Sequence, residues 1–339
     1  MRAGLLIVSL LLLVGSVWVG EVLPGHVAID VPRVDGDWWQ IAPNAPSDLG
    51  PLATGKENAC DFTIFRAGDG TWRCIACVRG TAAPGERLFY QWSAPALTDK
   101  DWKPLGILEV ERGPRLPTTQ PTSVQAPHHV LYEGKHYLFY NSAGARAVVS
   151  DDGLHWQQFH GADGESMLFQ MGRDVCVFRD GNRWIAYYCG NLPGGHGAGA
   201  MMARTADALA GPWSKQELII RSAGNPESPF ILKRDGLYYL WQQLAVYVST
   251  DPLDFQQAPL INHLTDVWYG GKWAPDILQD GAQWYVAGYG RGIYLAKLTW
   301  ERRSADQIAT WRTRWLAYLD REAARRAAAS RPTTSPVQP

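Results

Sequence analysis

Five copies of one hairpin pattern constrain this chain more than any other feature of its sequence. Each copy has an apolar strand, a tight turn that contains an acidic residue and a glycine, and a second strand rich in Tyr and Trp. The turn glycines are Gly70, Gly134, Gly181, Gly236 and Gly281. Such turns supply the positive φ that hairpins need, and the flanking residues alternate with the period of two that is typical of strands.

A second, weaker hairpin that ends on an aromatic residue follows each strong one, and the last copy is truncated. Four strands per repeat, at intervals of roughly 45 to 65 residues, is the pattern of propeller blades. A β-sandwich also has short strands, but it lacks this ordered alternation of strong and weak hairpins. The sequence therefore predicts an all-β fold, with one five-bladed β-propeller over residues 56–300.

The N-terminal region predicts export. Residues 1–20 place Arg2 before an apolar run from Leu5 to Val14, which is short for a membrane span and typical of a signal peptide. No A-x-A cleavage site follows, so an uncleaved membrane anchor is the alternative. We expect a secreted or periplasmic protein that contacts a membrane only through this segment. Residues 21–55, rich in Pro, Gly and Asp, predict an N-terminal extension that packs on the propeller or closes its ring.

The C-terminal region predicts a helix and a tail. Ser304-x-x-Gln307 resembles a capping box, and apolar residues recur at helical spacing at Ile308, Trp311, Trp315 and Leu319. We expect a helix over 301–321 that docks through this aromatic stripe. Residues 322–339 are rich in Ala, Arg and Pro and predict disorder.

Charge and cysteine content exclude several classes of function. The formal net charge is -1, and no Lys/Arg-rich block indicates a nucleic-acid partner. Five cysteines leave at least one unpaired, and Cys74-x-x-Cys77 falls inside an expected strand, which argues against a redox or zinc motif. We expect buried, apolar cysteines and no cofactor, with a structural cation in the central channel as the one exception considered.

Polar residues recur where the first strand of each repeat begins. In a propeller these innermost strands line the central channel, so their starts converge on one face. Read at that position, the repeats offer Asp61, the pair His128 and His129, Asp174, Glu227, and the stretch 273–276. Only one of the two adjacent histidines is expected to face the channel, because side chains alternate along a strand.

This pattern resembles the five-bladed glycosidases of glycoside hydrolase family 43 and its relatives, families 32, 62 and 117. Asp61 heads ACDFTIF, Asp174 heads GRDVCVF, and Glu227 heads ESPFILKRDGLYYL. The order and spacing agree across about 240 residues, and the Q-A-P and W-A-P that open the second and fifth repeats resemble the W-A-P of that group. The resemblance implies that Asp61 is a general base, Glu227 a general acid, and Asp174 the residue that tunes the acid.

Three acids at one channel mouth suit inverting hydrolysis. An inverting glycosidase holds one protonated carboxyl beside the leaving oxygen and one carboxylate beside a water, roughly 6.5 to 9.5 Å apart. A third carboxylate raises the pKa of the acid by repulsion. Each acid also has a structural interpretation, since an Asp before a strand is often a cap; Glu227, fixed between two prolines ahead of an apolar strand, is the least easily explained in this way.

Further residues near the strand starts are candidates for contacts with sugar. Arg173 and one of the histidines, taken as His128, have polar groups for substrate oxygens. Aromatic rings stack on sugar rings, which is the proposed role of Trp273 and, less strongly, of Trp241. The remaining substrate-binding candidates are Lys272 and Arg291. Half of these residues are expected to be structural, and the spacing of the histidines does not build a metal site.

The preferred function is an exported glycoside hydrolase that acts on plant- or algal-type saccharides, with arabinosides, xylosides and galactosides as the first substrates to try. The main alternative is a propeller that binds carbohydrate without catalysis. A sialidase-like propeller is a lesser alternative. Ser150–Trp156 approaches an S-x-D-x-G-x-x-W box, but this stretch occurs only once in the sequence. A phosphorolytic enzyme is another, although the strand starts show few clustered basic residues.

Overall fold

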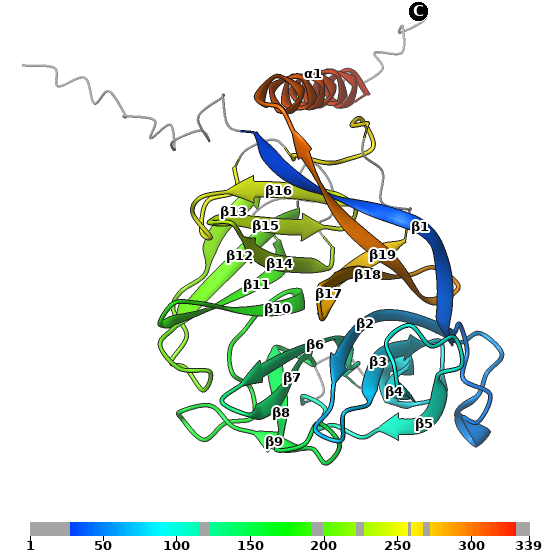
Figure 1. The fold of residues 1–339 in the computed structure, drawn as a ribbon. Helices are drawn as coiled ribbons and strands as arrows, with labels where there is room; N and C mark the ends of the chain where they lie inside the picture. The colour runs from blue at the N-terminus through cyan, green and yellow to red at the C-terminus, as the bar shows by residue number, and fades with distance from the viewer. Residues whose placement is uncertain are drawn as a thin grey trace, which may run out of the picture.

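The computed structural model describes residues 28–114, 122–191, 199–221, 227–256, 259–266 and 272–329. The expected signal peptide or anchor lies outside these residues. The described chain forms five antiparallel sheets around a central axis, followed by one C-terminal helix (Figure 1). The all-β, five-bladed propeller expected from the repeats is confirmed.

The first three blades are complete four-stranded sheets in chain order. Blade one contains β2 (Asn58–Arg66), β3 (Trp72–Arg79), β4 (Arg87–Ala94) and β5 (Lys103–Leu108). Blade two contains β6 (Gln125–Tyr132), β7 (Lys135–Asn141), β8 (Ala145–Ser150) and β9 (Gln157–Phe159). Blade three contains β10 (Arg173–Asp180), β11 (Arg183–Asn191), β12 (Gly199–Ala206) and β13 (Glu217–Arg221). Two short 3-10 helices accompany blade one: η1 (Gly50–Leu52) precedes β2, and η2 (Pro84–Glu86) lies in the β3–β4 connection.

The last two blades depart from this pattern. Blade four has three named strands in the described residues: β14 (Pro229–Arg234), β15 (Leu237–Gln242) and β16 (Ala245–Ser249). An isolated bridge between Val246 and Ile261 continues its sheet. Blade five has the order β17 (Trp273–Asp280), β18 (Gln283–Tyr289), β19 (Gly292–Arg303) and then β1 (Ile29–Pro43).

The outer strand of blade five therefore comes from the start of the described chain. Ile29 pairs with Arg303 and Pro43 with Gly292, so β1 follows β19 along its whole length. Residues 29–43 belong to the segment expected to pack on the propeller or close its ring, and as the outer strand of blade five they join the two ends of the ring. This pairing also explains why the fifth repeat is truncated: its fourth strand lies at the other end of the sequence.

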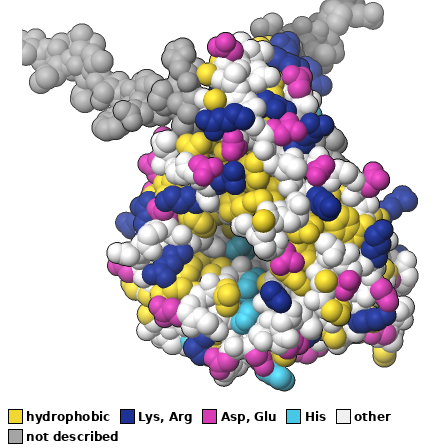
Figure 2. All heavy atoms as spheres, in the orientation of Figure 1, with side chains coloured by type: hydrophobic (Ala, Val, Ile, Leu, Met, Phe, Trp, Pro, Cys, Tyr) yellow, Lys and Arg dark blue, Asp and Glu magenta, His cyan; other side chains and the backbone are white. Residues whose placement is uncertain are grey.

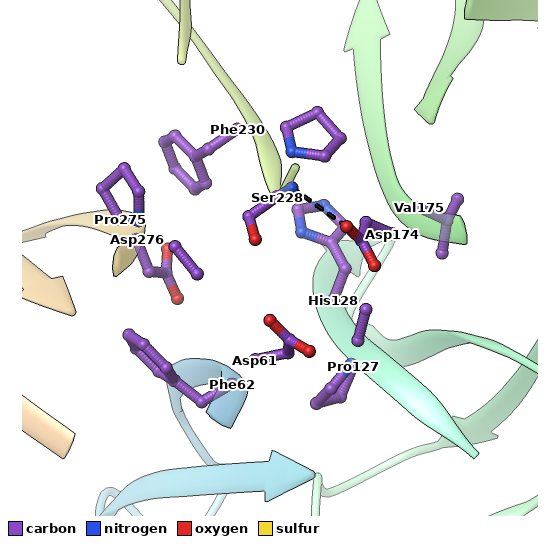
Figure 3. Close-up of a pocket in the computed structure, with 13 residues that line it drawn as sticks. Asp61, Phe62, Pro127, His128, Asp174, Val175, Ser228, Phe230, Pro275 and Asp276 are labelled. Atoms are coloured by element: carbon purple, nitrogen blue, oxygen red, sulfur yellow. Dashed lines mark hydrogen bonds between the residues drawn. The ribbon is translucent and has the colours of Figure 1, made fainter. Parts of the chain in front are cut away.

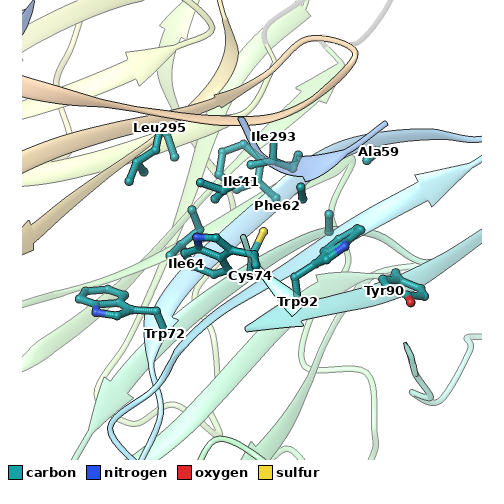
Figure 4. Close-up of a cluster of buried hydrophobic side chains, with 14 of the residues drawn as sticks. Ile41, Ala59, Phe62, Ile64, Trp72, Cys74, Tyr90, Trp92, Ile293 and Leu295 are labelled. Carbon is teal, nitrogen blue, oxygen red and sulfur yellow. The ribbon is translucent and has the colours of Figure 1, made fainter. Parts of the chain in front are cut away.

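The hairpin turns are those that the sequence predicts. The five turn glycines have φ between 58° and 85°, in the left-handed region. Between neighbouring blades lie five clusters of buried side chains, which together form a circular core. Figure 4 shows the cluster between blades one and five, where Phe62 and Ile64 of β2 pack near Ile41 of β1 and Ile293 of β19. The strand starts are thus held on a rigid, closed ring.

The C-terminal helix α1 (Ala305–Ala329) is longer than expected. Its capping box is present, with the Ser304 amide donating to Gln307 Oε1 (3.0 Å) and the Gln307 amide donating to Ser304 Oγ (3.3 Å). Ile308 and Trp311 are buried against blades four and five. The disorder expected from residue 322 is wrong up to Ala329, because Ala and Arg favour helix once a capped helix has started; residues 330–339 lie outside the described chain.

The five cysteines are all free and buried, as expected. Within the described residues, no helix combines the length and the apolar character that crossing a membrane needs.

Candidate active site

A strained residue lies near the start of the innermost strand of every blade. Five non-glycine residues at equivalent positions have φ in the left-handed region: Asp61 (33°), Ala126 (48°), Asp174 (58°), Ser228 (48°) and Ala274 (51°). At four of them the strand pairing shifts register, as it does at a β-bulge. Such positions cost about 1–3 kcal/mol each and concentrate at functional sites, and bulges redirect side chains at barrel rims.

These five positions enclose a small pocket on the propeller axis, with a volume of about 40 Å³. Every blade contributes to its lining, and Asp61, Asp174, Ser228 and Asp276 all reach into the same space (Figure 3). The volume exceeds the 10–15 Å³ that one water molecule needs. The starts of the five innermost strands therefore converge at the channel mouth.

Asp174 connects blade three to blade four at this mouth. Its side chain is 5% exposed, and Oδ2 accepts a hydrogen bond from the Ser228 amide at 3.1 Å. The Cys189 thiol lies 3.7 Å from the same oxygen. Burial raises the pKa of Asp174 well above its usual range, and the Asp61 charge and a hydrogen bond with Glu227 act in the same direction.

Glu227 precedes the strained Ser228 and is held by blade three. Arg173 donates to both of its oxygens, from Nε to Oε2 at 3.2 Å and from the terminal nitrogen to Oε1 at 2.6 Å. This pairing raises the pKa of Arg173. Arg173, expected to bind substrate directly, is thus engaged with the candidate acid in this structure.

Asp61 lies across the pocket on blade one (Figure 3). Burial raises its pKa, the Arg87 guanidinium opposes this, and the Glu227 carboxylate adds to it. Asp61 and Asp174 therefore line the same pocket, whereas Glu227 directly precedes the lining residue Ser228 and is not itself among the lining residues. Arg87 is the first residue of β4, the third strand of blade one. The sequence comparison of the repeats covered only the innermost strands, so it missed Arg87.

Asp276 is a fourth acid at the pocket and is not one of the site residues that the sequence predicts. It follows the W-A-P of blade five, and its Oδ2 accepts a hydrogen bond from the Ile64 amide of blade one at 3.0 Å. Burial raises its pKa to about 7, and that hydrogen bond opposes the shift. Asp276 thus connects blades five and one beneath the channel mouth.

The two adjacent histidines face opposite ways, as expected. His128 lines the pocket, with Nε2 at 3.0 Å from the Val177 carbonyl oxygen, and burial lowers its pKa to about 4. His129 stacks on Phe65 with ring centroids 4.0 Å apart and hydrogen-bonds His136. A neutral imidazole is therefore the form of His128 at the channel.

The assignment of Trp241 as a sugar platform is wrong. Its side chain is fully buried in the core between blades four and five, edge-on to Phe230 at 5.8 Å. The physical reason is its place on β15: the middle strand of a blade is covered on both faces by neighbouring blades. The sequence pattern does not show this second cover.

The other predicted sugar contacts lie around the pocket rather than in its lining. Trp273, at the start of β17, is 45% exposed beside the lining residue Ala274. Lys272 Nζ sits 3.7 Å from the centre of the Tyr294 ring, on the third strand of blade five. Arg291 is exposed in the β18–β19 turn. Their contact with substrate stays a prediction.

Within the described residues, no group of three or more His, Cys, Asp or Glu side chains is arranged to hold a metal ion.

Ser150–Trp156, the sialidase-like stretch, forms a turn in which Asp152 accepts hydrogen bonds from the Leu154 and His155 amides. Charged side chains of both signs are scattered over the face shown in Figure 2, around a central hollow.

No family model matches the chain, and no curated protein matches it. Solved structures do. A thermostable family-43 glycoside hydrolase is 16% identical with a TM-score of 0.52, over 74% of this chain and 91% of that one. A family-43 β-xylosidase/α-arabinofuranosidase from a compost microbial metagenome, in complex with xylotriose, is also 16% identical, with a TM-score of 0.52 over 81% and 97%. The catalytic domain of a family-62 α-L-arabinofuranosidase from Coprinopsis cinerea is 13% identical, with a TM-score of 0.51 over 82% and 98%. The likeness to five-bladed glycosidases is therefore confirmed for the fold.

Proposed function

We propose that the protein is an exported glycoside hydrolase that cleaves plant- or algal-type saccharides with inversion of configuration. In this mechanism Asp61 is the general base, Glu227 the general acid, and Asp174 the residue that tunes the acid. The observation that carries the proposal is the placement of Asp61 and Asp174 in one strained channel mouth, with Glu227 directly before the lining residue Ser228 and contributing to the raised pKa of both. The shared fold with family-43 and family-62 enzymes supports it.

The surroundings of Asp174 support a proton held at this side of the site. Burial, the Asp61 charge and the Glu227 carboxyl all raise the pKa of Asp174, so Asp174 holds a proton in the free site. In the free site Arg173 binds both Glu227 oxygens, which favours the proton on Asp174. When a substrate hydroxyl takes over part of Arg173, the proton moves to Glu227, which delivers it to the leaving oxygen.

Asp61 is suited to activating water. A carboxylate whose pKa is raised by burial is a stronger base than one in water, and Arg87 keeps it within reach of ionisation. The pocket in front of Asp61 has room for a water molecule. Asp61 accepts the proton of that water as its oxygen attacks the anomeric carbon, on the face opposite the bond to the leaving group.

The test is hydrolysis of aryl arabinofuranosides, xylosides and galactosides, and of the corresponding oligosaccharides, by the full chain. We expect Glu227→Gln to lower kcat by about 10²- to 10⁴-fold, the usual contribution of a general acid, while sugar binding is retained. Glu217→Gln, on the exposed edge strand β13, is the matched control and should leave kcat unchanged. Proton NMR of the first product should show the inverted anomer.

Two outcomes would contradict the proposal. Undiminished turnover by Glu227→Gln would remove the acid, and a product of retained configuration would remove the inverting mechanism. A wild-type protein that binds oligosaccharides but cleaves none of the panel would instead be a carbohydrate-binding propeller.

A further inference from the structure

Two cysteines face each other across the two inner strands of blade one. Cys60 of β2 and Cys77 of β3 are direct pairing partners in this antiparallel sheet. Their side chains are 1% and 0% exposed, and both belong to the buried cluster between blades one and two. Residues directly opposite in antiparallel strands have Cα atoms about 4.5–5.5 Å apart, and a disulfide needs about 4.4–6.8 Å. The backbone therefore holds this pair at the separation that a disulfide bond requires.

The other three cysteines, which also lie within the described residues, are placed differently. Cys74 is three residues before Cys77 on β3 and packs in the cluster between blades one and five, on the opposite face of the blade. Cys176 and Cys189 lie on neighbouring strands of blade three but are not pairing partners. A hydrogen bond with the Cys77 side chain and burial together raise the pKa of the Cys60 thiol. Strand register and side-chain contact thus agree on Cys60 and Cys77.

The pair lies directly behind the candidate general base. Cys60 precedes Asp61, where φ is 33° and the strand pairing shifts register. Burial raises the pKa of Asp61, and a hydrogen bond from Cys60 is one of the contacts that lower it again. A disulfide has no S–H group to donate, so forming one removes this contact. The oxidation state of Cys60 is therefore connected with how readily Asp61 ionises.

Charged groups from the other strands and blades also act on Asp61. Arg87 and Arg79 lower its pKa, whereas Glu227 raises it. The other titratable groups that share its pocket or interact with it are His128, Asp174, Asp276 and Tyr289. Oxidation of the two thiols adds no charge and removes none from these groups, so the lost S–H donor is the difference between the two forms of the site.

We propose that Cys60 and Cys77 form a cross-strand disulfide while the chain folds, and that this bond closes the first hairpin of the propeller and weakens the hold of Asp61 on its charge. The reaction is thiol–disulfide exchange, with a disulfide compound such as oxidised glutathione as the oxidant. One protein thiolate attacks the oxidant and displaces a thiolate; the second attacks the protein sulfur of the mixed disulfide and displaces the other. Two electrons and two protons pass from the cysteines to the oxidant, which leaves as two thiols.

The burial of the pair determines when the bond forms. In the folded protein Leu138 and Tyr140 of β7 pack in the same cluster, and the Cys77 sulfur lies 3.5 Å from the Val124 carbonyl oxygen. The β2–β3 hairpin is local in sequence, and local contacts form before distant ones. Exchange therefore precedes the docking of blade two, which then shields the finished bond from reductants. Folding in an oxidising compartment, as proposed for an exported protein, favours the disulfide.

The first experiment counts thiols and does not depend on the proposed function. The full chain is unfolded in urea with a reductant, then refolded with oxidised glutathione in one sample and with reduced glutathione in another. Each sample is denatured and alkylated. We expect alkylation of all five cysteines in the reduced sample and of two fewer in the oxidised one. Trypsin releases Cys60 in residues 57–66 and Cys77 in residues 74–79, and these two peptides should appear joined. Five free thiols in both samples overturn the proposal.

Two variants identify the partner, because residues 74–79 also contain Cys74. Cys74→Ala should keep the joined peptides, and Cys77→Ala should lose them; the reverse result overturns the pairing. Closing the hairpin should raise the thermal unfolding midpoint of oxidised wild type and of oxidised Cys74→Ala by about 5 °C over their reduced forms, and leave Cys77→Ala unchanged. Circular dichroism shows whether each variant folds, and the thiol count of the wild type decides the bond if one does not.

The second experiment tests the effect on Asp61 and rests on the proposed function. A general base works while it is ionised, so activity is lost as pH falls through its pKa. Loss of the S–H donor raises the pKa of Asp61, so the acidic limb of the kcat/KM profile should lie at higher pH in the oxidised protein. Activity on the acidic side should be about three- to tenfold lower than in the reduced protein. Cys77→Ala, which keeps the Cys60 thiol, should give one profile under both treatments.

The outcomes separate the parts of the proposal. An acidic limb at the same pH in both forms overturns the effect on the base, and a shift that persists in Cys77→Ala assigns it to another thiol. A protein without turnover on the substrate panel refutes the proposed function and the effect on the base together. The thiol count and the joined peptides still decide the disulfide in that case.

Discussion

Replacing Asp174 by Asn removes one acid of the hydrogen-bonded pair while keeping a side-chain oxygen that accepts from the Ser228 amide. As a scale, two unit charges about 4 Å apart interact by about 4 kcal/mol at an effective dielectric constant of about 20. The Glu227 side chain is 37% exposed, so solvent screens part of the repulsion within the pair. We expect Asp174→Asn to lower activity on the basic side of the pH profile.

The direction follows from the role of Glu227. A general acid works while it is protonated, so activity is lost as pH rises through its pKa. Without the neighbouring carboxyl, the basic limb of the kcat/KM profile moves to lower pH, and activity on the basic side falls about ten- to hundredfold. The assay is the pH dependence of kcat/KM on an aryl glycoside. Asp101→Asn, at a carboxyl of blade one that is 85% exposed, is the matched control; a basic limb that stays in place in Asp174→Asn refutes the reasoning.

Three further changes have defined outcomes. Burial raises the pKa of Asp276 to about 7, so between about pH 4 and pH 7 the folded protein holds a proton there that the unfolded chain has released. The free energy of unfolding therefore falls as pH rises from about 4 to about 7. Urea unfolding should show that Asp276→Asn removes up to about 4 kcal/mol of this fall. Trp311→Ala should lower the free energy of unfolding by about 3–5 kcal/mol, whereas Leu316→Ala, at a residue 52% exposed, should change it by less than about 0.5 kcal/mol. Trp273→Ala should raise KM by about five- to thirtyfold through lost stacking, with kcat nearly unchanged, and an equal loss in kcat would contradict the platform role.

The repeated architecture was predictable because its signals are local. A glycine with positive φ and the alternation around it define each hairpin within about 18 residues, and the Ser304–Gln307 box defines the start of the helix in four. The convergence of Asp61 and Asp174 then follows from the fold alone, since equivalent residues of the blades lie at one channel mouth, and Glu227 directly precedes the equivalent residue of blade four, Ser228.

The features that sequence reasoning missed depend on contacts between distant segments. Residues 29–43 contain Pro, Gly and Asp and resemble a loop, yet pairing with β19 makes them a strand. Trp241 looks suited to a binding face until blades cover its strand on both sides. The bidentate contact of Arg173 with Glu227 depends on the orientation of two blades, which no spacing encodes.

The strand β1 gives the protein a particular order of assembly. Its partner is at the far end of the chain: the Arg302–Asp30 ion pair joins residues 272 positions apart. Contacts of such separation form late, because a long loop must close before they contribute. During synthesis, the circle of blades therefore stays open until its last strand has emerged. The step that completes the ring is also the one that brings blade five, with Asp276, against the blade that carries Asp61, so an incomplete chain lacks the finished central pocket.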